Sequence, residues 1–138
     1  MTVHVFVYGT LKSDQCRAGC WPVQALSISP ATIRGTLYDL GAYPALSPGD
    51  GLVAGECWSI ADADEAAVLE VLDAIEGYSG NPDCDLYTRV RATCTLADGS
   101  ERPCWTYYFT QVPPGPVVAG NPAHWPDVEG IATHAGCR

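Results

Sequence analysis

One glutamate, Glu76, has a position that favours acid–base chemistry near neutral pH. It follows Leu69 by seven residues and Leu72 by four, so a helix would turn its side chain toward the apolar face. It also lies in the last turn before Gly77, where the helix dipole disfavours a negative charge. Burial and the dipole both raise the pKa of a carboxyl group, which suits a general base or acid. The competing interpretation is a solvated glutamate before a helix-ending glycine.

The second candidate is a turn that directly follows an apolar, β-branched run. Its residues are Tyr8, Gly9, Thr10 and Leu11. A glycine at the end of a strand permits a sharp turn and leaves backbone N–H groups outward, and such concavities bind carboxylates or phosphates. A plain turn after an edge strand is the alternative, because glycine is common in any turn. If both candidates are functional, Glu76 should face the turn at Gly9.

Other catalytic or metal-binding patterns are weak. The histidines His4, His124 and His134 are scattered without metal-ligand spacing, and no Gly-x-Ser-x-Gly motif marks a serine hydrolase. Seven cysteines, an odd number, without an export signal indicate reduced thiols in a cytoplasmic protein. Cys16 and Cys20 are close in sequence, but no second pair at metal spacing follows. We therefore predict no metal site.

Strand patterns position the turn. Residues 3–8 are rich in β-branched and aromatic side chains and stop at Gly9, which predicts a strand. Residues 33–40 and 52–60 predict two more strands, each interrupted by glycine, with a turn or loop at residues 41–44 between them.

A helix over residues 62–76 positions the glutamate. Asp62 and Glu65 match the spacing of a capping box, and Gly77 stands where a left-handed C-terminal cap is expected. The apolar stripe repeats at helical spacing and consists of Val68, Val71, Leu72 and Ile75.

Residues 86–96 and 101–110 predict a β-hairpin around Asp98 and Gly99, the dipeptide of a type I′ turn. A two-residue loop pairs Ala92 with Trp105 and Val90 with Tyr107. Alternation then places on one face Val90, Ala92, Cys94, Trp105 and Tyr107, and on the other Arg89, Arg91, Thr93, Thr106 and Tyr108.

Length and composition indicate a single α+β domain. The chain has 138 residues, and from about residue 112 it becomes rich in Pro and Gly, which predicts a tail that wraps the domain. The net charge of -9 disfavours binding to nucleic acid or to anionic membranes. No apolar run reaches the ~18 residues needed to span a bilayer.

The motifs together resemble the γ-glutamylcyclotransferase-like superfamily, in its small branch of γ-glutamylamine cyclotransferases and AIG2-like proteins. The similar blocks follow the family order over almost the whole chain. They are residues 5–12 (VFVYGTLK), 35–46 (GTLYDLGAYPAL), 53–58 (VAGECW), 72–78 (LDAIEGY), 86–90 (LYTRV), 105–107 (WTY) and 120–125 (GNPAHW).

The resemblance implies a small mixed-strand β-barrel with flanking helices and a γ-glutamyl cyclotransferase activity. In that reaction the α-amine of a γ-glutamyl group attacks its own γ-carbonyl, giving 5-oxoproline and a free amine or amino acid, without a metal or organic cofactor. The resemblance makes Glu76 the catalytic base and acid. It implies substrate binding by Tyr8, Gly9, Thr10, Leu11 and Tyr107.

Three interpretations stay open at this point. The chain is a cyclotransferase for a small γ-glutamyl amine or peptide, or the same enzyme removing a γ-glutamyl group within a biosynthetic pathway. The third is a non-catalytic small-molecule-binding domain with the same fold. Residues 13–29 and 79–85 have no pattern that selects a leaving group, so the identity of the amine is open.

Overall fold

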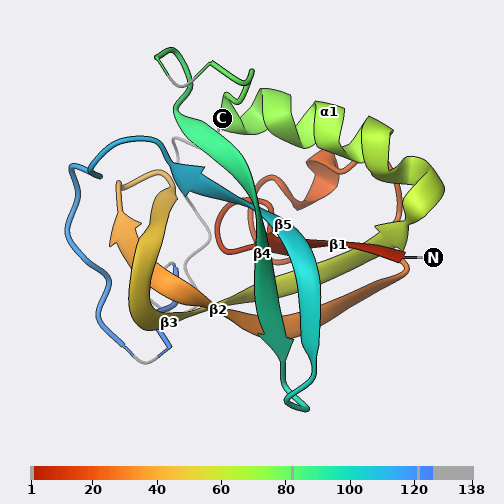
Figure 1. The fold of residues 1–138 in the computed structure, drawn as a ribbon, viewed down its shortest axis with the longest axis horizontal. Coiled ribbons are helices and arrows are strands. Elements are labelled where there is room, and N and C mark those ends of the chain that lie inside the picture. The colour runs from red at the N-terminus through yellow and green to blue at the C-terminus, as the bar shows by residue number, and fades with distance from the viewer. Residues whose placement is uncertain (1, 82, 121, 126–138) are drawn as a thin grey trace.

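Five β-strands close into a barrel in the computed structural model of this chain, which describes residues 2–81, 83–120 and 122–125. Their order around the barrel is β1-β3-β2-β4-β5 (Figure 1). Neighbouring strands are antiparallel except β1 and β5, which run parallel and close the barrel where Val5 lies beside Trp105. The predicted small mixed-strand barrel is confirmed. The strands are β1 Thr2–Val7, β2 Ser27–Asp39, β3 Pro44–Ala61, β4 Tyr87–Leu96 and β5 Glu101–Phe109.

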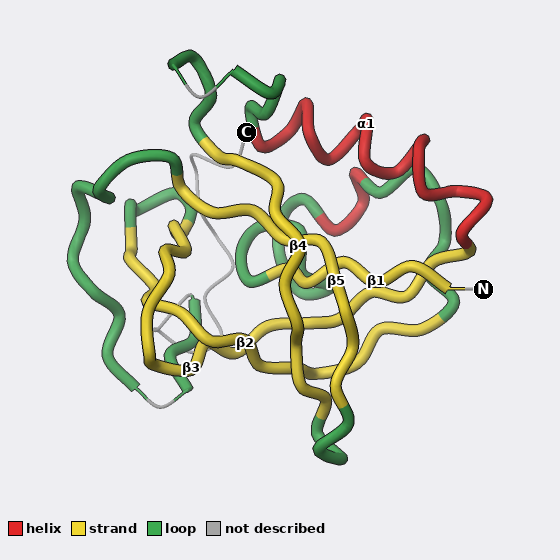
Figure 2. Tube along the Cα trace, viewed as in Figure 1, coloured by secondary structure: helices red, strands yellow, loops and turns green. Residues whose placement is uncertain are grey.

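One α-helix, α1 (Glu65–Glu76), flanks the barrel in the described part of the chain, with the short 3-10 helices η1 (Ala18–Cys20) and η2 (Asp62–Asp64). The helix lies across the outside of the barrel on the side of β1 (Figure 1, Figure 2). Gly77 ends it in the left-handed conformation, with φ 70°, as predicted.

The predicted capping box at the start of this helix is wrong. The chain enters α1 through η2, so the N–H of Glu65 bonds to the backbone carbonyl of Asp62. The N-cap residue is Asp64, and its side chain makes no capping bond. The Glu65 carboxylate instead accepts the indole N–H of Trp105 at 2.9 Å, which ties the start of the helix to β5.

Alternation along β1 divides the apolar side chains between two cores. Val5 and Val7 pack with Val68 and Leu72 of α1 in a layer between the helix and the barrel. Phe6 and the following Tyr8 belong to the cluster on the other face, inside the barrel. Because β1 is buried on both faces, packing on both sides fixes the position of the turn that follows it.

Strands β2 and β3 are longer than the sequence predicts. They pair antiparallel from Ser27 opposite Ser59 to Asp39 opposite Pro44, with a register shift between Arg34 and Thr36. The predicted turn at residues 41–44 does separate them, although Pro44 itself opens β3.

The predicted register of the β4–β5 hairpin is wrong by one residue. Val90 lies opposite Thr106 and Arg91 opposite Trp105. The loop is residues 97–99, with Gly99 at φ 87°, because Leu96 and Ser100 are still bonded. This longer loop with a left-handed glycine replaces the expected type I′ turn. Since one step of register exchanges faces, Arg89 and Arg91 share a face with Trp105 and Tyr107.

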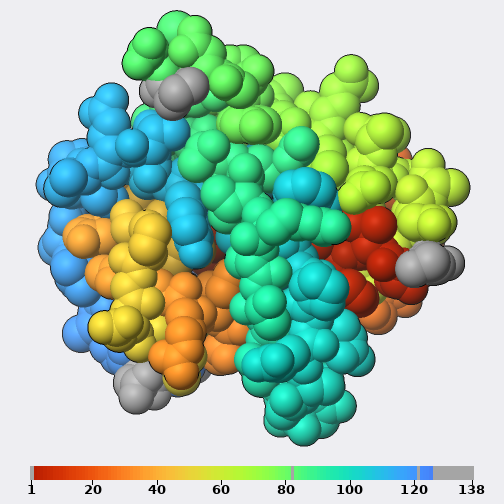
Figure 3. Space-filling model, in the orientation of Figure 1, coloured from red at the N-terminus to blue at the C-terminus, as the bar shows by residue number. Residues whose placement is uncertain are grey.

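The tail after β5 contributes to the barrel interior. Val117 and Ala123 form isolated bridges to β2 and β3, and the buried Trp125 packs in the interior cluster. Figure 3 shows this blue segment beside the orange and yellow strands. Residues 126–138 of the predicted tail lie outside the described residues.

Most cysteines of the described residues agree with the expectation of free thiols. Cys57, Cys94 and Cys104 are buried, and Cys20 and Cys84 are exposed. The exception is Cys16, which is disulfide-bonded, so the expectation of seven reduced thiols is wrong for this residue. No helix among the described residues is long and apolar enough to cross a membrane.

Candidate active site

All six residues predicted for the site line one small cavity at the end of β1. They are Tyr8, Gly9, Thr10, Leu11, Glu76 and Tyr107. The wall is completed by Tyr43, Pro44 and Tyr87, which are not among the predicted site residues, together with Phe6 and Val7. The cavity measures about 30 Å³, room for about two water molecules, so its walls are closely packed. Four parts of the chain thus converge here: the end of β1, the β2–β3 turn, the end of α1 and the β4–β5 hairpin.

Gly9 is required by close packing. A Cβ atom at this position would lie 2.7 Å from Cδ and 2.8 Å from Cγ of Pro44, distances that real side chains do not tolerate. Its φ is not in the left-handed region, so the conformational freedom of glycine is not the reason. The turn closes through the N–H of Lys12, which donates to the carbonyl of Gly9 at 3.1 Å.

Backbone donors are available at this turn. Among the described residues, the N–H groups of Gly9, Thr10 and Leu11 have no backbone partner. Buried backbone N–H groups are nearly always bonded in proteins, so donors left open beside a cavity suit a ligand with acceptor oxygens.

Glu76 has the perturbed carboxyl group that the sequence predicts. Burial raises its pKa from 4.5 to about 7, while the positive charge of Arg17 acts in the opposite direction. Within the described residues its carboxylate has no hydrogen-bond partner. A carboxyl group that titrates near neutral pH and is not committed to a structural bond is able to accept and return a proton.

The tyrosines around Glu76 are fixed by hydrogen bonds. The Tyr8 hydroxyl donates to the carbonyl of Tyr107 at 2.6 Å, and the Tyr107 hydroxyl donates to Oδ1 of Asp73 at 2.7 Å. Asp73 also pairs with Arg89 at 2.6 Å. Burial is the largest cause that raises the pKa of each phenol, and the charge of Glu76 adds to it. Both rings therefore stay neutral and form rigid walls.

A larger cavity of about 450 Å³ adjoins the first at the C-terminal end of α1. The two share Thr10, Tyr43, Glu76 and Tyr87, so Glu76 lies where a close-fitting inner cavity meets a roomy outer one. Arg17 lines only the outer cavity. No sequence signal points to Arg17, since residues 13–29 have neither periodicity nor a motif.

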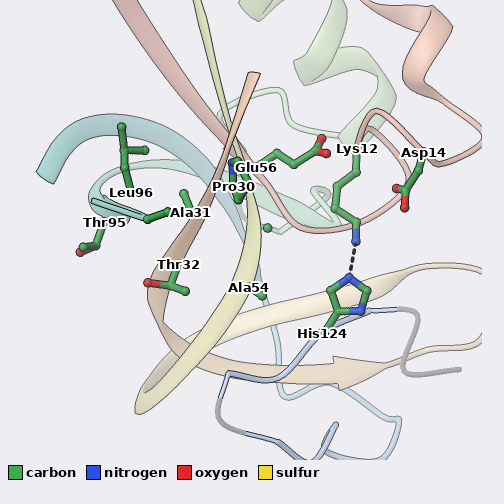
Figure 4. Close-up of a pocket in the computed structure, with 12 residues that line it drawn as sticks. Lys12, Asp14, Pro30, Ala31, Thr32, Ala54, Glu56, Thr95, Leu96 and His124 are labelled. Carbon is green, nitrogen blue, oxygen red and sulfur yellow. Dashed lines mark hydrogen bonds between the residues drawn. The ribbon is translucent and has the colours of Figure 1, made fainter. Parts of the chain in front are cut away.

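Another cavity, of about 360 Å³, lies elsewhere on the barrel, between Lys12, His124 and the strands β2 and β3 (Figure 4). Lys12 is buried, and its Nζ donates to the carbonyl of Trp125 at 2.6 Å and lies 3.2 Å from Nε2 of His124. These contacts occupy the Lys12 amine in fixing His124 and Trp125, so we place the candidate chemistry at Glu76.

In the described ranges, no group of three or more His, Cys, Asp or Glu side chains could hold a metal ion.

Comparison with known proteins assigns the chain to a family. Residues 5–126 match the model of the family described as "Gamma-glutamyl cyclotransferase, AIG2-like", which covers the turn after β1, Glu76 and Tyr107. The chain belongs to this family. The resemblance stated from the sequence is thereby confirmed.

Two relatives and one solved structure illustrate the range of the family. The chain is 30% identical to the gamma-L-glutamyl-butirosin B gamma-glutamyl cyclotransferase of Niallia circulans over 78% of this chain and 67% of that protein. It is 37% identical to the gamma-glutamylcyclotransferase family protein ytfP of Citrobacter rodentium over 56% of this chain and 65% of that protein. The crystal structure of an AIG2-like protein from Mus musculus superposes with a TM-score of 0.60 and 25% identity, covering 81% of this chain and 80% of that one. The matched segment thus spans about two thirds of both relatives.

Proposed function

We propose that this protein is a γ-glutamyl cyclotransferase, which converts a small γ-glutamyl compound into 5-oxoproline and a free amine or amino acid. One observation carries the proposal: Glu76, with a pKa raised to about 7, lines the same close-fitting cavity as the turn from Gly9 to Leu11. Family membership supports the same reaction class.

The reaction is intramolecular and moves only protons and one acyl bond. The Glu76 carboxylate removes a proton from the α-ammonium group of the substrate, and the free amine attacks the γ-carbonyl carbon. A five-membered ring closes and the carbonyl oxygen becomes an oxyanion. Glu76 then returns the proton to the leaving nitrogen, and the oxyanion collapses as the old carbon–nitrogen bond breaks. The ring nitrogen loses its second proton to the Glu76 carboxylate, and 5-oxoproline remains. A pKa near 7 suits a group that must do both steps.

The turn supplies binding and polarisation. The N–H groups of Gly9, Thr10 and Leu11 are proposed to bind the glutamyl end of the substrate and to stabilise charge on its oxygens. Such donors act most strongly where they are preorganised and water is excluded. Tyr8 and Tyr107, each fixed by a hydrogen bond from its own hydroxyl, limit the positions available to the glutamyl chain. Proximity contributes as well, because nucleophile and electrophile belong to one molecule.

We place the glutamyl half beside the turn, where the inner cavity of about 30 Å³ must widen to admit it. The leaving group then extends past Glu76 into the outer cavity. This route uses protein groups and a small-molecule substrate, and it requires neither a metal nor an organic cofactor.

The test is to offer the purified chain a panel of γ-glutamyl amines, amino acids and peptides and to measure 5-oxoproline. Release from at least one compound, lost in Glu76→Gln, is the expected result. Binding without 5-oxoproline from any compound would instead establish the alternative, a non-catalytic small-molecule-binding domain.

A further inference from the structure

Arg17 is the feature of this site that the reaction described above does not use. It lines the outer cavity, where Glu76 is the only other charged residue among the described ones. The remaining wall is apolar or neutral, from Thr10, Tyr43, Ile75, Gly77, Leu86 and Tyr87. A single cation in such a cavity selects for an anionic group on whatever occupies it.

The backbone around Arg17 is held by the site itself. Its N–H donates to the carbonyl of Thr10 at 2.8 Å, and its own carbonyl accepts the N–H of Cys20 at 2.9 Å. Trp21 fixes the segment further by stacking on Trp58, with ring centroids 4.0 Å apart and planes within 2°. The guanidinium is therefore carried by a docked segment that packs directly on the turn after β1.

The guanidinium also has unused hydrogen-bonding capacity. Its Nε is buried and has no hydrogen-bond partner among the described residues. No ion pair within 4 Å joins Arg17 to Glu76 in that part of the chain, although its charge is near enough to influence the Glu76 carboxyl group. A buried donor without a partner costs free energy, and a planar guanidinium matches a carboxylate with two parallel bonds.

We propose that Arg17 binds a carboxylate on the leaving group, so that this protein prefers γ-glutamyl amino acids or peptides over neutral or cationic γ-glutamyl amines. The assignment rests on the proposed function. The α-carboxylate of the glutamyl half has its donors at the turn of Gly9 to Leu11 in the inner cavity, which Arg17 does not line. The carboxylate that remains for Arg17 is the one on the amine carried in the outer cavity.

The experiment compares two substrates that differ by one carboxylate, γ-glutamyl-alanine and γ-glutamyl-ethylamide. Release of 5-oxoproline is measured at pH 8.5, where Glu76 is ionised, for the full chain and for Arg17→Gln and Arg17→Lys. We expect wild type to favour γ-glutamyl-alanine by about 10- to 100-fold in kcat/KM, mainly through KM, as a charge-assisted bond provides. In Arg17→Gln this ratio falls to about 1, while Arg17→Lys keeps part of it.

Arg34→Gln is the matched control, because Arg34 is exposed on β2 and bonds to the carbonyl of Asp50, outside both cavities. It should keep the wild-type ratio, and thermal melts establish that each variant is folded. Equal rates with both substrates in wild type, or a preference that survives in Arg17→Gln, overturn the assignment.

The failure of the proposed function is a separate outcome. If neither substrate gives 5-oxoproline, calorimetric binding of the same pair decides the role of Arg17. Tighter binding of γ-glutamyl-alanine that disappears in Arg17→Gln supports the carboxylate site without catalysis, and equal binding overturns it.

Discussion

Replacing Glu76 by Gln separates the catalytic role of this residue from any structural one. The amide keeps the size of the side chain but cannot take a proton from the substrate ammonium near neutral pH. Loss of a general base typically costs about 10²–10⁴ in rate, and here one group serves both proton transfers. We therefore expect a loss of about 10⁴ or more in kcat.

The same substitution should stabilise the fold in a pH-dependent way. The pKa of Glu76 is raised in the folded state, from 4.5 to about 7, so the folded protein holds this proton more tightly than the unfolded chain. The resulting stability is fully present below pH 4.5 and is lost as the pH rises through 7. At 1.36 kcal/mol for each pKa unit, the loss is at most about 3 kcal/mol.

Glu76 is partly exposed, so screening by solvent reduces this figure to roughly 1–2 kcal/mol. Glutamine is neutral at every pH and does not suffer the loss. Glu76→Gln should therefore melt close to wild type at pH 4.5, and about 3–8 °C above it at pH 8. A carboxylate at the C-terminal end of a helix also opposes the dipole, by about 0.3–1 kcal/mol, with the same sign.

The assay combines 5-oxoproline release with thermal melts at pH 4.5 and 8. Glu70→Gln is the control, since Glu70 is an exposed glutamate of the same helix, and it should alter neither rate nor melting by a comparable amount. If Glu76→Gln turns over like wild type, Glu76 has no part in the mechanism. If it melts below wild type at pH 8, burial of this carboxyl group is not a source of strain.

Three more results follow from the site. Gly9→Ala should destabilise the fold by about 1–3 kcal/mol and lower activity, because its methyl group meets the Pro44 ring; Pro44→Ala in the same chain should recover part of the melting temperature. The value of kcat/KM should decrease as the pH is lowered below about 7, because Glu76 becomes protonated. Arg17→Gln should shift this decrease to higher pH, since Arg17 lowers the pKa of Glu76. Turnover should survive a metal chelator, because the proposed steps move only protons between substrate and protein; a loss that zinc restores would contradict this route.

The sequence by itself determined the local features of this protein. The strand that ends at Gly9 and the helix that ends at Gly77 follow from side-chain periodicity and glycine position, which depend on neighbours a few residues away. The same periodicity turned Glu76 toward the apolar face, and burial there is the largest cause of its raised pKa. The family blocks were also readable, since they are runs of residues in a fixed order.

Only the tertiary structure decided how distant segments meet. The hairpin register was mispredicted because Asp98-Gly99 fits a two-residue turn as well as the longer loop with Gly99 left-handed, and packing of the strands selects between them. The need for glycine at position 9 comes from Pro44, which is far away along the chain. Arg17 lines the outer cavity although it lies in a segment without periodicity. The stacking of Trp21 on Trp58 holds that segment against the barrel. Such contacts depend on the shape of the closed barrel, and no local pattern in the chain encodes them.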